Sequence, residues 1–247
     1  MEILIAIDDT DNEESIGTGR LARMLADNLA KKGLINSASV TRHQLLIHPD
    51  IPYTSHNSSA CIEAVAASPD IHETGEAAKS FLLENFHKGA NPGLCIANKH
   101  SLPSELQEFG YRAQKQVLEI SETKELAERF NLLTWEYGET GQGCIGAMSA
   151  LGLRSAGNDG RFIGLNGIRD ITGFITVQEL LSNTPIKSVT SVSGETLEPG
   201  EVIDTCDWIR PSLNNGQAVL VVEKKADCWI TIEKKKRKKK RSLTIEA

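Results

Sequence analysis

Three aspartates near the start of the chain have the residue type and the spacing for metal or phosphate chemistry. Asp8, Asp9 and Asp11 follow directly on five apolar residues, 3–7, and Thr10 lies between them. Carboxylates this close repel one another, and a divalent cation or a cationic substrate would relieve the repulsion. We therefore expect a divalent-metal or phosphate-handling site here. The alternative is a solvated acidic turn in which one aspartate caps the next helix.

The glycine-rich loop 138–146 is a second candidate for phosphate binding. Its segment Gly141-Gln142-Gly143-Cys144-Ile145-Gly146 has the spacing of a dinucleotide-binding motif. That motif also needs an acidic residue at the end of the next strand, whereas Asp159 and Asp170 fall in glycine-containing turns. A nicotinamide site is therefore disfavoured. The backbone N–H groups of a glycine loop that opens a helix can still hold phosphate, and close helix packing is the alternative.

The elements that must position these residues alternate between strands and helices. The uninterrupted apolar run 3–7 predicts a strand buried on both faces, in the middle of a sheet with helices on each side. In such sheets ligands gather at the carboxyl ends of the strands. The first helix is expected at 17–33, with Gly33 as its stop.

Further patterns extend this alternation along the chain. Strands are expected at 38–48, 59–66, 94–97 and 117–120, and further strands with Gly, Asn and Pro turns within 186–206 and 217–232. Helices are expected at 74–87, 102–110, 121–131, from the glycine loop to 153, and at 174–181. Asn214-Asn215-Gly216 predicts a hairpin or loop. The predicted fold class is α/β (α+β), with mixed sheets and a C-terminal β-hairpin.

Composition narrows the class of protein. The chain has 247 residues and 40% hydrophobic residues, enough for one large or two small folded domains. No apolar run approaches the roughly 18 residues of a membrane span. The chain opens Met1-Glu2 without a basic signal region, so a cytoplasmic location is expected. The five cysteines lack the spacing of a zinc site or a disulfide framework.

Charge is unevenly distributed between the tail and the rest of the chain. Residues 234–241 are all Lys or Arg, so the net charge of −6 becomes −14 without these eight cations. An acidic body is a poor general surface for nucleic acid, whereas the basic tail could bind RNA phosphates by itself. A solubilising tail, or a strand end that frays into lysines, is the alternative.

Two other classes of phosphate enzyme fit less well. The chain contains no Gly-x-x-x-x-Gly-Lys-Ser/Thr segment, which excludes a P-loop enzyme. Asp9-Thr10-Asp11 after an apolar strand is similar to the haloacid dehalogenase phosphotransferases, in which the first aspartate is the nucleophile and the second a general acid. Those enzymes need a second acidic pair at a strand end, which 157–160 does not supply.

The order of five motifs resembles the archaeal tRNA-isoleucine 2-agmatinylcytidine synthetase family. The chain has segments similar to the acidic motif of the family, its arginine and proline loop, its Asp-Pro-Gly turn, its tyrosine-arginine-alanine segment and its glycine loop. The corresponding residues are Asp8-Asp9-Thr10-Asp11-Asn12 with Thr18, Arg42 with 48–53, Asn91-Pro92-Gly93, Tyr111-Arg112-Ala113 and 141–147. Together these motifs cover most of the chain in the right order.

The resemblance implies a kinase-like α/β domain with a ferredoxin-like domain, and a reaction that depends on ATP. Members of the family activate the carbonyl of a tRNA wobble cytidine with ATP, and agmatine displaces the phosphate. By resemblance, Asp8, Asp9 and Asp11 would be catalytic residues and would hold Mg²⁺. Thr10, Thr18 and the glycines of the loop would bind ATP, the glycines being Gly141, Gly143 and Gly146.

Three departures from the family shape the expected function. Residues 54–59 lack the family's cations, and Gly19 replaces a second threonine. The full-length enzymes continue into an OB-fold and a zinc ribbon that bind tRNA, and we expect this chain to be a stand-alone homologue without them. We therefore expect an ATP- and Mg²⁺-dependent phosphoryl-transfer enzyme that acts on a small molecule or an RNA. A non-catalytic nucleotide- or ligand-binding protein of the same fold is the alternative.

The sequence suggests four segments. Residues 1–90 would be the N-terminal part of the kinase-like domain with its acidic loop, and 91–185 a ferredoxin-like region with the glycine loop. Residues 186–233 would be a β-rich C-terminal part, and 234–247 a basic tail.

Overall fold

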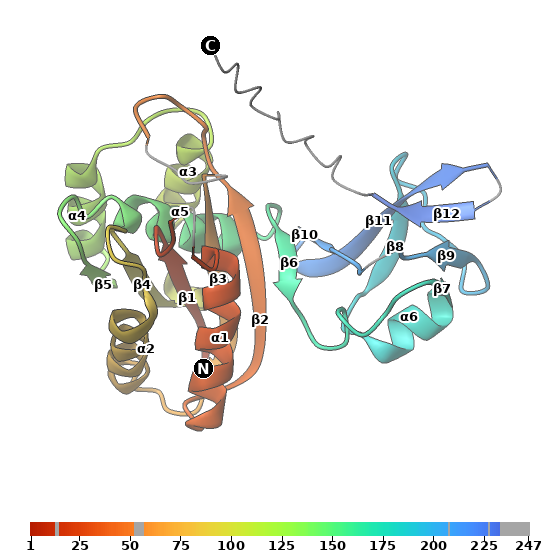
Figure 1. Cartoon of the computed structure of the whole chain (residues 1–247), viewed down its shortest axis with the longest axis horizontal. Helices are drawn as coiled ribbons and strands as arrows, with labels where there is room; N and C mark the ends of the chain where they lie inside the picture. Colours follow the sequence, from red (N-terminus) through yellow and green to blue (C-terminus); the bar gives the residue numbers. More distant parts are fainter. Residues whose placement is uncertain (13–14, 52–56, 207, 227, 233–247) are drawn as a thin grey trace, which may run out of the picture.

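The computed structural model describes residues 1–12, 15–51, 57–206, 208–226 and 228–232 (Figure 1). The predictions for positions 52–56 of the proline loop and for the basic tail 234–241 lie outside the described residues. The described chain forms two lobes, which we call lobe 1 (residues 1–157) and lobe 2 (residues 158–232) (Figure 1).

Lobe 1 is a sheet covered by helices on both faces. Its strands lie in the order β5-β4-β1-β3-β2, and every neighbouring pair is antiparallel. They are β1 (Glu2–Asp8), β2 (Ile35–Gln44), β3 (Ser58–Ala66), β4 (Gly93–Asn98) and β5 (Leu133–Glu136). Helices α1 (Thr18–Lys31) and α2 (His72–Asn85) cover one face. Helices α3 (Ser104–Ala113), α4 (Ile120–Arg129) and α5 (Gly143–Ala156) cover the other, and the short 3₁₀ helix η1 (Lys99–Ser101) follows β4.

Strand β1 lies at the centre of this arrangement. Its residues 3–7 are completely buried, with Ile3, Ile5 and Ile7 in the core under α1 and α2, and Leu4 and Ala6 in the core under α5. The prediction of a strand buried on both faces is therefore confirmed. Its neighbours β3 and β4 are antiparallel to it, so the rule for parallel sheets does not explain why a site forms at its carboxyl end.

The first six elements have a recognisable connectivity. Strands and helices alternate as β1-α1-β2-β3-α2-β4, and the four strands lie in the order β4-β1-β3-β2. This β-α-β-β-α-β connectivity is ferredoxin-like. It occupies residues 2–98, whereas the sequence suggested a ferredoxin-like region at 91–185. The boundaries of the four predicted segments stay a prediction, and strands from the first two of them pair in one sheet.

Two predicted elements differ from the structure, and one strand of lobe 1 was not predicted. The strand predicted at 117–120 is wrong: residues 117–119 are irregular, and Ile120 begins α4. Residues 133–136, for which no element was predicted, form β5 at the edge of the sheet. The helix predicted at 174–181 begins later, because Thr176 caps α6 by accepting a hydrogen bond from the backbone N–H of Glu179.

Lobe 2 is a smaller β-rich unit with one described helix. It contains β6 (Arg161–Gly164), β7 (Phe174–Thr176), α6 (Val177–Asn183), β8 (Ser188–Ser191), β9 (Val202–Asp204), β10 (Ser212–Asn214), β11 (Gln217–Lys225) and β12 (Cys228–Thr231). The predicted hairpin is confirmed: β10 and β11 pair antiparallel across Asn215 and Gly216, whose φ angles are 47° and 73°. Two positive φ angles are typical of the tight turns that match strand twist.

The lobes share one sheet through β6. This strand pairs with β2 of lobe 1 and with β10 of lobe 2, and Arg161 lies opposite both Arg42 and Ser212. A buried contact supports the junction: Asp159 Oδ1 lies 2.9 Å from His43 Nδ1, and its Oδ2 accepts a hydrogen bond from Gln114. Within the described ranges, no helix is long and apolar enough to cross a membrane.

Candidate functional site

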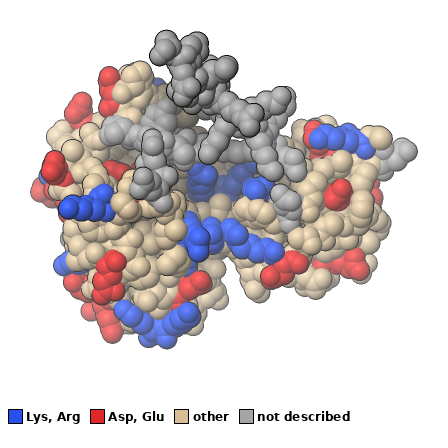
Figure 2. Space-filling model, in the orientation of Figure 1, with Lys and Arg blue, Asp and Glu red and all other residues tan. Residues whose placement is uncertain are grey.

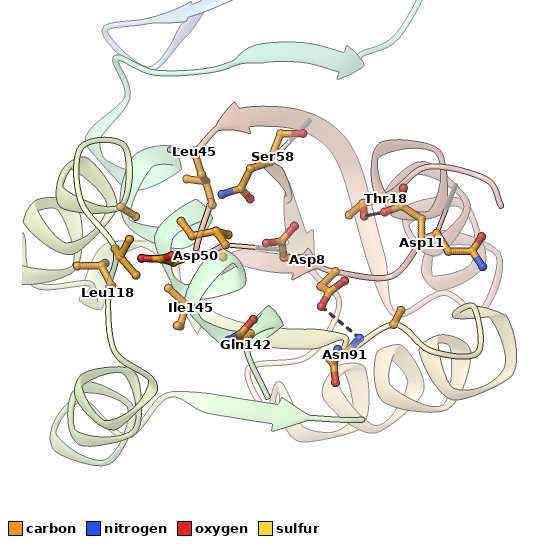
Figure 3. Close-up of a pocket in the computed structure, with 18 of the residues that line it drawn as sticks. Asp8, Asp11, Thr18, Leu45, Asp50, Ser58, Asn91, Leu118, Gln142 and Ile145 are labelled. Atoms are coloured by element: carbon orange, nitrogen blue, oxygen red, sulfur yellow. Dashed lines mark hydrogen bonds between the residues drawn. The ribbon is translucent and has the colours of Figure 1, made fainter. Parts of the chain in front are cut away.

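A cavity of about 320 Å³ opens at the carboxyl end of β1 (Figure 3). The end of β1, the starts of α1 and β3, the first turn of α5 and the loops 45–51, 89–91 and 116–118 contribute to its wall. In Figure 3, Asp8 lies near the middle, Asp11 and Thr18 on one side, and Asp50 and Leu118 on the other. The cavity lies within the range of small-molecule sites, about 300–1,000 Å³.

Asp8 is the last residue of β1, and its carboxylate packs against the first turn of α5. A Cβ atom at Gly146 would lie 1.7 Å from Asp8 Oδ2, so only glycine leaves room for the carboxylate. Burial raises the pKa of Asp8 from 3.8 to about 7, and the negative charges of Asp9 and Asp11 add to the increase. A bound cation would therefore favour the ionised form.

Asp9 has an unusual backbone conformation that turns the chain out of β1. Its φ angle is 49°, in the left-handed region that aspartate and asparagine tolerate better than most residues. Its Oδ2 accepts a hydrogen bond from the backbone N–H of Asn91 at 3.2 Å. Burial raises the pKa of Asp9, and the negative charge of Asp11 adds to this increase. The local backbone thus holds a second carboxyl with a raised pKa in the wall of the cavity.

Asp11 belongs to a short chain of hydroxyl groups. Thr18 donates a hydrogen bond to Asp11 Oδ1 at 2.6 Å, and Thr10 donates to Thr18 Oγ1 at 3.0 Å. Thr10 is buried and does not line the cavity, whereas Thr18 does. The N-cap of α1 is Gly17, and no side-chain hydrogen bond from the described residues caps this helix, so none of the described aspartates has the capping role of the alternative interpretation.

The described charged side chains in the cavity wall are all acidic. They are Asp8, Asp9, Asp11 and Asp50, and no Lys or Arg is among the described residues that line it. Arg42 on β2 attracts Asp8 and Asp11 electrostatically, but burial outweighs this attraction at Asp8. Its Nε donates to Ser58 Oγ, which lies in the wall. The described wall therefore has an excess of negative charge that a cation would balance.

The wall opposite Asp11 is largely apolar. It is made by residues from the loop after β2, the end of α3 and the start of α5: Leu45, Ile51, Ala113, Val117, Leu118 and Ile145. Asp50 lies among them (Figure 3). The cavity thus has a carboxylate-rich half and an apolar half, which suits an organic ligand whose charged end reaches the aspartates through a cation.

The glycine loop contributes to the cavity only in part. Gly146 lies in the wall, together with Gln142 and Ile145. Gly143 packs on the main chain instead, because its Cβ would lie 2.3 Å from the Asn91 carbonyl oxygen. Gly141 has a φ of +65° and abuts Glu136, and neither glycine lines the cavity. The structure therefore brings Asp8, Asp9, Asp11, Thr18 and Gly146 together in the wall of the cavity. The other predicted site residues, Thr10, Gly141 and Gly143, do not line it.

Sequence reasoning missed several residues of the wall. Asp50 was noticed only as part of a proline-rich loop, and Asn91 only as part of a turn. Asn57, Gln116 and Val117 carry no motif that marks them. The resemblance to the family did single out the segments that contain Asp50 and Asn91, and that was the available signal.

Oxygen donors of this kind suit a hard divalent cation. In the described part of the chain, however, no three His, Cys, Asp or Glu side chains are close enough together to hold a metal ion by themselves. Mg²⁺ is usually bound by one or two carboxylates together with substrate phosphates and water, and it does not need such a cage. The raised pKa values of Asp8 and Asp9 and the absence of a cationic side chain from the described wall are consistent with this mode.

Comparison with known proteins places the chain beside one group of enzymes. It is 27% identical to a tRNA-isoleucine 2-agmatinylcytidine synthetase of Thermococcus sibiricus over 156 residues, which are 62% of this chain and 35% of that protein. The synthetase of Methanosarcina acetivorans is 28% identical over 61% of this chain and 35% of its own length. An uncharacterized protein of Methanocaldococcus jannaschii is 30% identical over 62% of this chain and 50% of its own length. No protein-family model matches the chain.

Solved structures show the same fold. A tRNA fluorescent labeling enzyme superposes with a TM-score of 0.54 and 24% identity, over 62% of this chain and 36% of that one. The synthetase in complex with its isoleucine tRNA and ATP superposes with a TM-score of 0.53 and 22% identity, over 62% and 36%. The resemblance to the synthetase family and the α/β fold class are thus confirmed. The chain spans about a third of the length of the curated synthetases it matches.

Proposed function

We propose that the protein is an ATP- and Mg²⁺-dependent transferase or ligase that activates an acceptor by phosphoryl transfer. The acceptor would be a small molecule or an RNA. The synthetases that the chain resembles are named for a tRNA. The observation that carries the proposal is the cluster Asp8, Asp9 and Asp11 in the wall of a cavity that no described Lys or Arg lines. Phosphoryl transfer depends mostly on positioning and charge neutralisation, for which such a cluster is suited.

The residues of the cavity have separate parts in this proposal. Asp8, Asp9 and Asp11 would hold Mg²⁺, which when bound would neutralise the phosphates of ATP. Thr18 orients the Asp11 carboxylate through its 2.6 Å hydrogen bond. The first turn of α5, next to Asp8, carries the positive end of the helix dipole and favours an anionic group there. The apolar half of the wall would exclude water from the acceptor.

A test of binding uses thermal melting of the full chain with ATP and Mg²⁺. A ligand at 100 times its dissociation constant stabilises the folded state by about 2.7 kcal/mol, so millimolar ATP with Mg²⁺ should raise the melting temperature by several degrees. ATP without Mg²⁺ should give a much smaller shift, because the aspartates would repel its phosphates. An absent shift under both conditions would contradict the proposal.

A test of catalysis compares two asparagine variants. Asp9→Asn keeps an oxygen that can accept from the Asn91 N–H and tolerates the positive φ, so the fold should persist while ATP turnover across a panel of acceptors is lost. The matched control is Asp70→Asn, since Asp70 also accepts a backbone N–H, from His72, but is exposed and does not line the cavity. Equal turnover in Asp9→Asn and the parent protein would exclude an essential role for this carboxylate.

A second candidate function is non-catalytic binding of a nucleotide or a related ligand. The observation in its favour is that the described carboxylates do not form a metal cage by themselves. A melting shift with ATP and Mg²⁺, without turnover for any acceptor, would select this function over the first.

A further inference from the structure

Arginines from both lobes meet where the lobes join. Figure 2 shows Lys and Arg side chains gathered in the hollow between the lobes, although the body of the protein is acidic. The arginines that the contacts below connect are two on α1, one on β6 and two in the loops of lobe 2: Arg20, Arg23, Arg161, Arg169 and Arg210. We call this set the arginine groove. The arginine groove contains no residue of the tail 234–241.

Arg23 joins the two lobes in this groove. Its stem lies across β6, because a Cβ atom at Gly164 would come within 3.1 Å of Arg23 Cγ. Its Nη1 donates to the Gly19 carbonyl oxygen at 3.2 Å, which leaves further guanidinium N–H groups for a ligand. Burial lowers the pKa of Arg23, and the positive charges of Arg169 and Arg20 lower it further. Three guanidinium groups from two lobes thus lie close enough to repel one another.

Trp208 organises the lobe 2 side of the groove. The guanidinium carbons of Arg169 and Arg210 lie 4.5 Å and 4.0 Å from the centre of its ring. Arg161 and Arg210 also line a small cavity together with Trp208. Cation–π contacts hold guanidinium groups in place over a ring without neutralising them. The ring therefore orients two arginines of the groove.

Ion pairs among the described residues do not balance the charge of four of these arginines. Among the described residues, no carboxylate lies within ion-pair distance of Arg20, Arg23, Arg161 or Arg169. Three other described arginines are in ion pairs: Arg112 with Glu122, Arg129 with Glu105, and Arg154 with Glu63. Arg42 donates to Ser58 instead. Arg20, Arg23, Arg161 and Arg169 thus have no ion-pair partner among the described residues, although the protein has a net charge of −6, and an external anion would balance their charge.

We propose that the arginine groove binds the phosphate backbone of an RNA. Guanidinium groups bind phosphate oxygens in bidentate fashion, and guanidinium or indole planes stack with unpaired bases. Helix α1 connects the groove to the cavity, because Thr18 lines the cavity and Arg20 and Arg23 follow within about two turns. RNA in the groove would thus lie beside the acidic cluster. Only the claim that this RNA is the acceptor rests on the proposed function.

The test measures binding of a fluorescently labelled RNA stem-loop to the full chain by anisotropy, over a series of salt concentrations and without ATP. The variant Arg23→Gln/Arg169→Gln should lower the affinity at least tenfold. Each lost phosphate contact should reduce the log–log salt slope by about 0.7–0.9. Every variant in the comparison contains the tail 234–241, so the tail contributes equally to the RNA affinity of each.

The matched control is Arg112→Gln/Arg129→Gln, which removes two positive charges from α3 and α4. It should leave the affinity and the salt slope unchanged. Thermal melting checks that each variant folds, and the single variant Arg169→Gln, at an exposed position, gives a smaller change of the same kind if the double variant does not fold. Equal affinity and slope in the parent protein and a folded groove variant would overturn the proposal.

A competition experiment separates RNA from an acidic protein partner. Polyglutamate at the same concentration of negative charge should displace the stem-loop poorly, because its carboxylates offer no bases to stack. Displacement as effective as that by unlabelled RNA would overturn the assignment to RNA. RNA binding without any melting shift from ATP and Mg²⁺ would contradict the proposed function while leaving the groove intact, and the reverse result would contradict only the groove.

Discussion

The cavity and the arginine groove are two clusters of like charge, built in different ways. In the cavity, Asp8 and Asp9 are held at close range by buried backbone, and burial raises the pKa of both. In the groove, the guanidinium groups lie over strands and rings nearer to solvent, and no pH that the fold would survive removes their charge. The difference is that a change in pH alters the charge of the cavity, whereas the charge of the groove is screened by salt or neutralised by a polyanion.

The largest effect that tests this contrast is the pH dependence caused by Asp8. Because the pKa of Asp8 is raised on folding, this carboxyl does not lower the free energy of unfolding below about pH 4, where it is protonated in both states. Between about pH 4 and pH 7 it destabilises the fold increasingly, and above about pH 7 the destabilisation stays constant. The full shift corresponds to about 4 kcal/mol, which contact with solvent in the cavity reduces. Asp8→Asn should therefore match the parent protein in stability near pH 4 and exceed it near pH 8, as measured by urea unfolding.

Asp159→Asn is the control, because its effect on stability near pH 8 should have the opposite sign. Burial alone would raise the pKa of Asp159, but hydrogen bonds from His43 and Gln114 outweigh it and lower the pKa. Asp159 thus stabilises the fold above about pH 4 and loses that contribution as the pH falls. Its asparagine variant should be less stable than the parent near pH 8. If Asp8→Asn behaved like Asp159→Asn, the account of a strained acidic cavity would be wrong.

The next effect concerns the close approach of α5 to Asp8. Gly146→Ala places a methyl group 1.7 Å from the Asp8 carboxylate as it now lies, so either the side chain or the helix must move. We expect a loss of about 1–3 kcal/mol in the free energy of unfolding and no melting shift with ATP and Mg²⁺. The control is Gly200→Ala, because nothing lies within 4 Å of a Cβ atom there. Normal ATP binding by Gly146→Ala would show that Asp8 need not keep its position.

The smallest effect concerns the hydroxyl chain beside Asp11. Thr18→Val removes the donor to Asp11 and the acceptor of Thr10, and should cost about 1 kcal/mol in the free energy of unfolding. It should also weaken binding of ATP with Mg²⁺, because Asp11 is no longer oriented. The control is Thr123→Val in the first turn of α4, where the buried hydroxyl has no hydrogen-bond partner among the described residues and its loss should not destabilise the protein. Equal losses in the free energy of unfolding in the two variants would show that the hydrogen bonds of Thr18 do not stabilise the protein.

The sequence predicted the centre of the cavity better than its rim. The apolar run 3–7 and the aspartates after it are local signals, and the structure has β1 and its carboxylates where the pattern placed them. Gly146 was also marked, but the motif could not distinguish it from Gly141 and Gly143. That distinction depends on which neighbours fill the space around each glycine, and these come from other parts of the chain.

Other features were not predictable from local patterns. Val117 and Leu118 are apolar like strand residues, yet they line the cavity and precede a helix instead of pairing. Arg23 and Arg169 are separated by nearly the whole of lobe 1, so no spacing rule connects them. Their proximity results from the pairing of β6 with β2, a long-range contact that single-sequence reasoning does not provide.

The pairing of β6 with β2 has a consequence for protein engineering and for evolution. Without lobe 2, the outer edge of β2 would expose unpaired N–H and C=O groups next to Thr41 and Arg42, and such an edge recruits strands from other molecules. A protein cut after Gly157 should thus tend to aggregate. A homologue without lobe 2 would need another segment, a charged rim or a second subunit to protect this edge. By pairing with β2, lobe 2 therefore also protects the sheet edge of lobe 1 against aggregation.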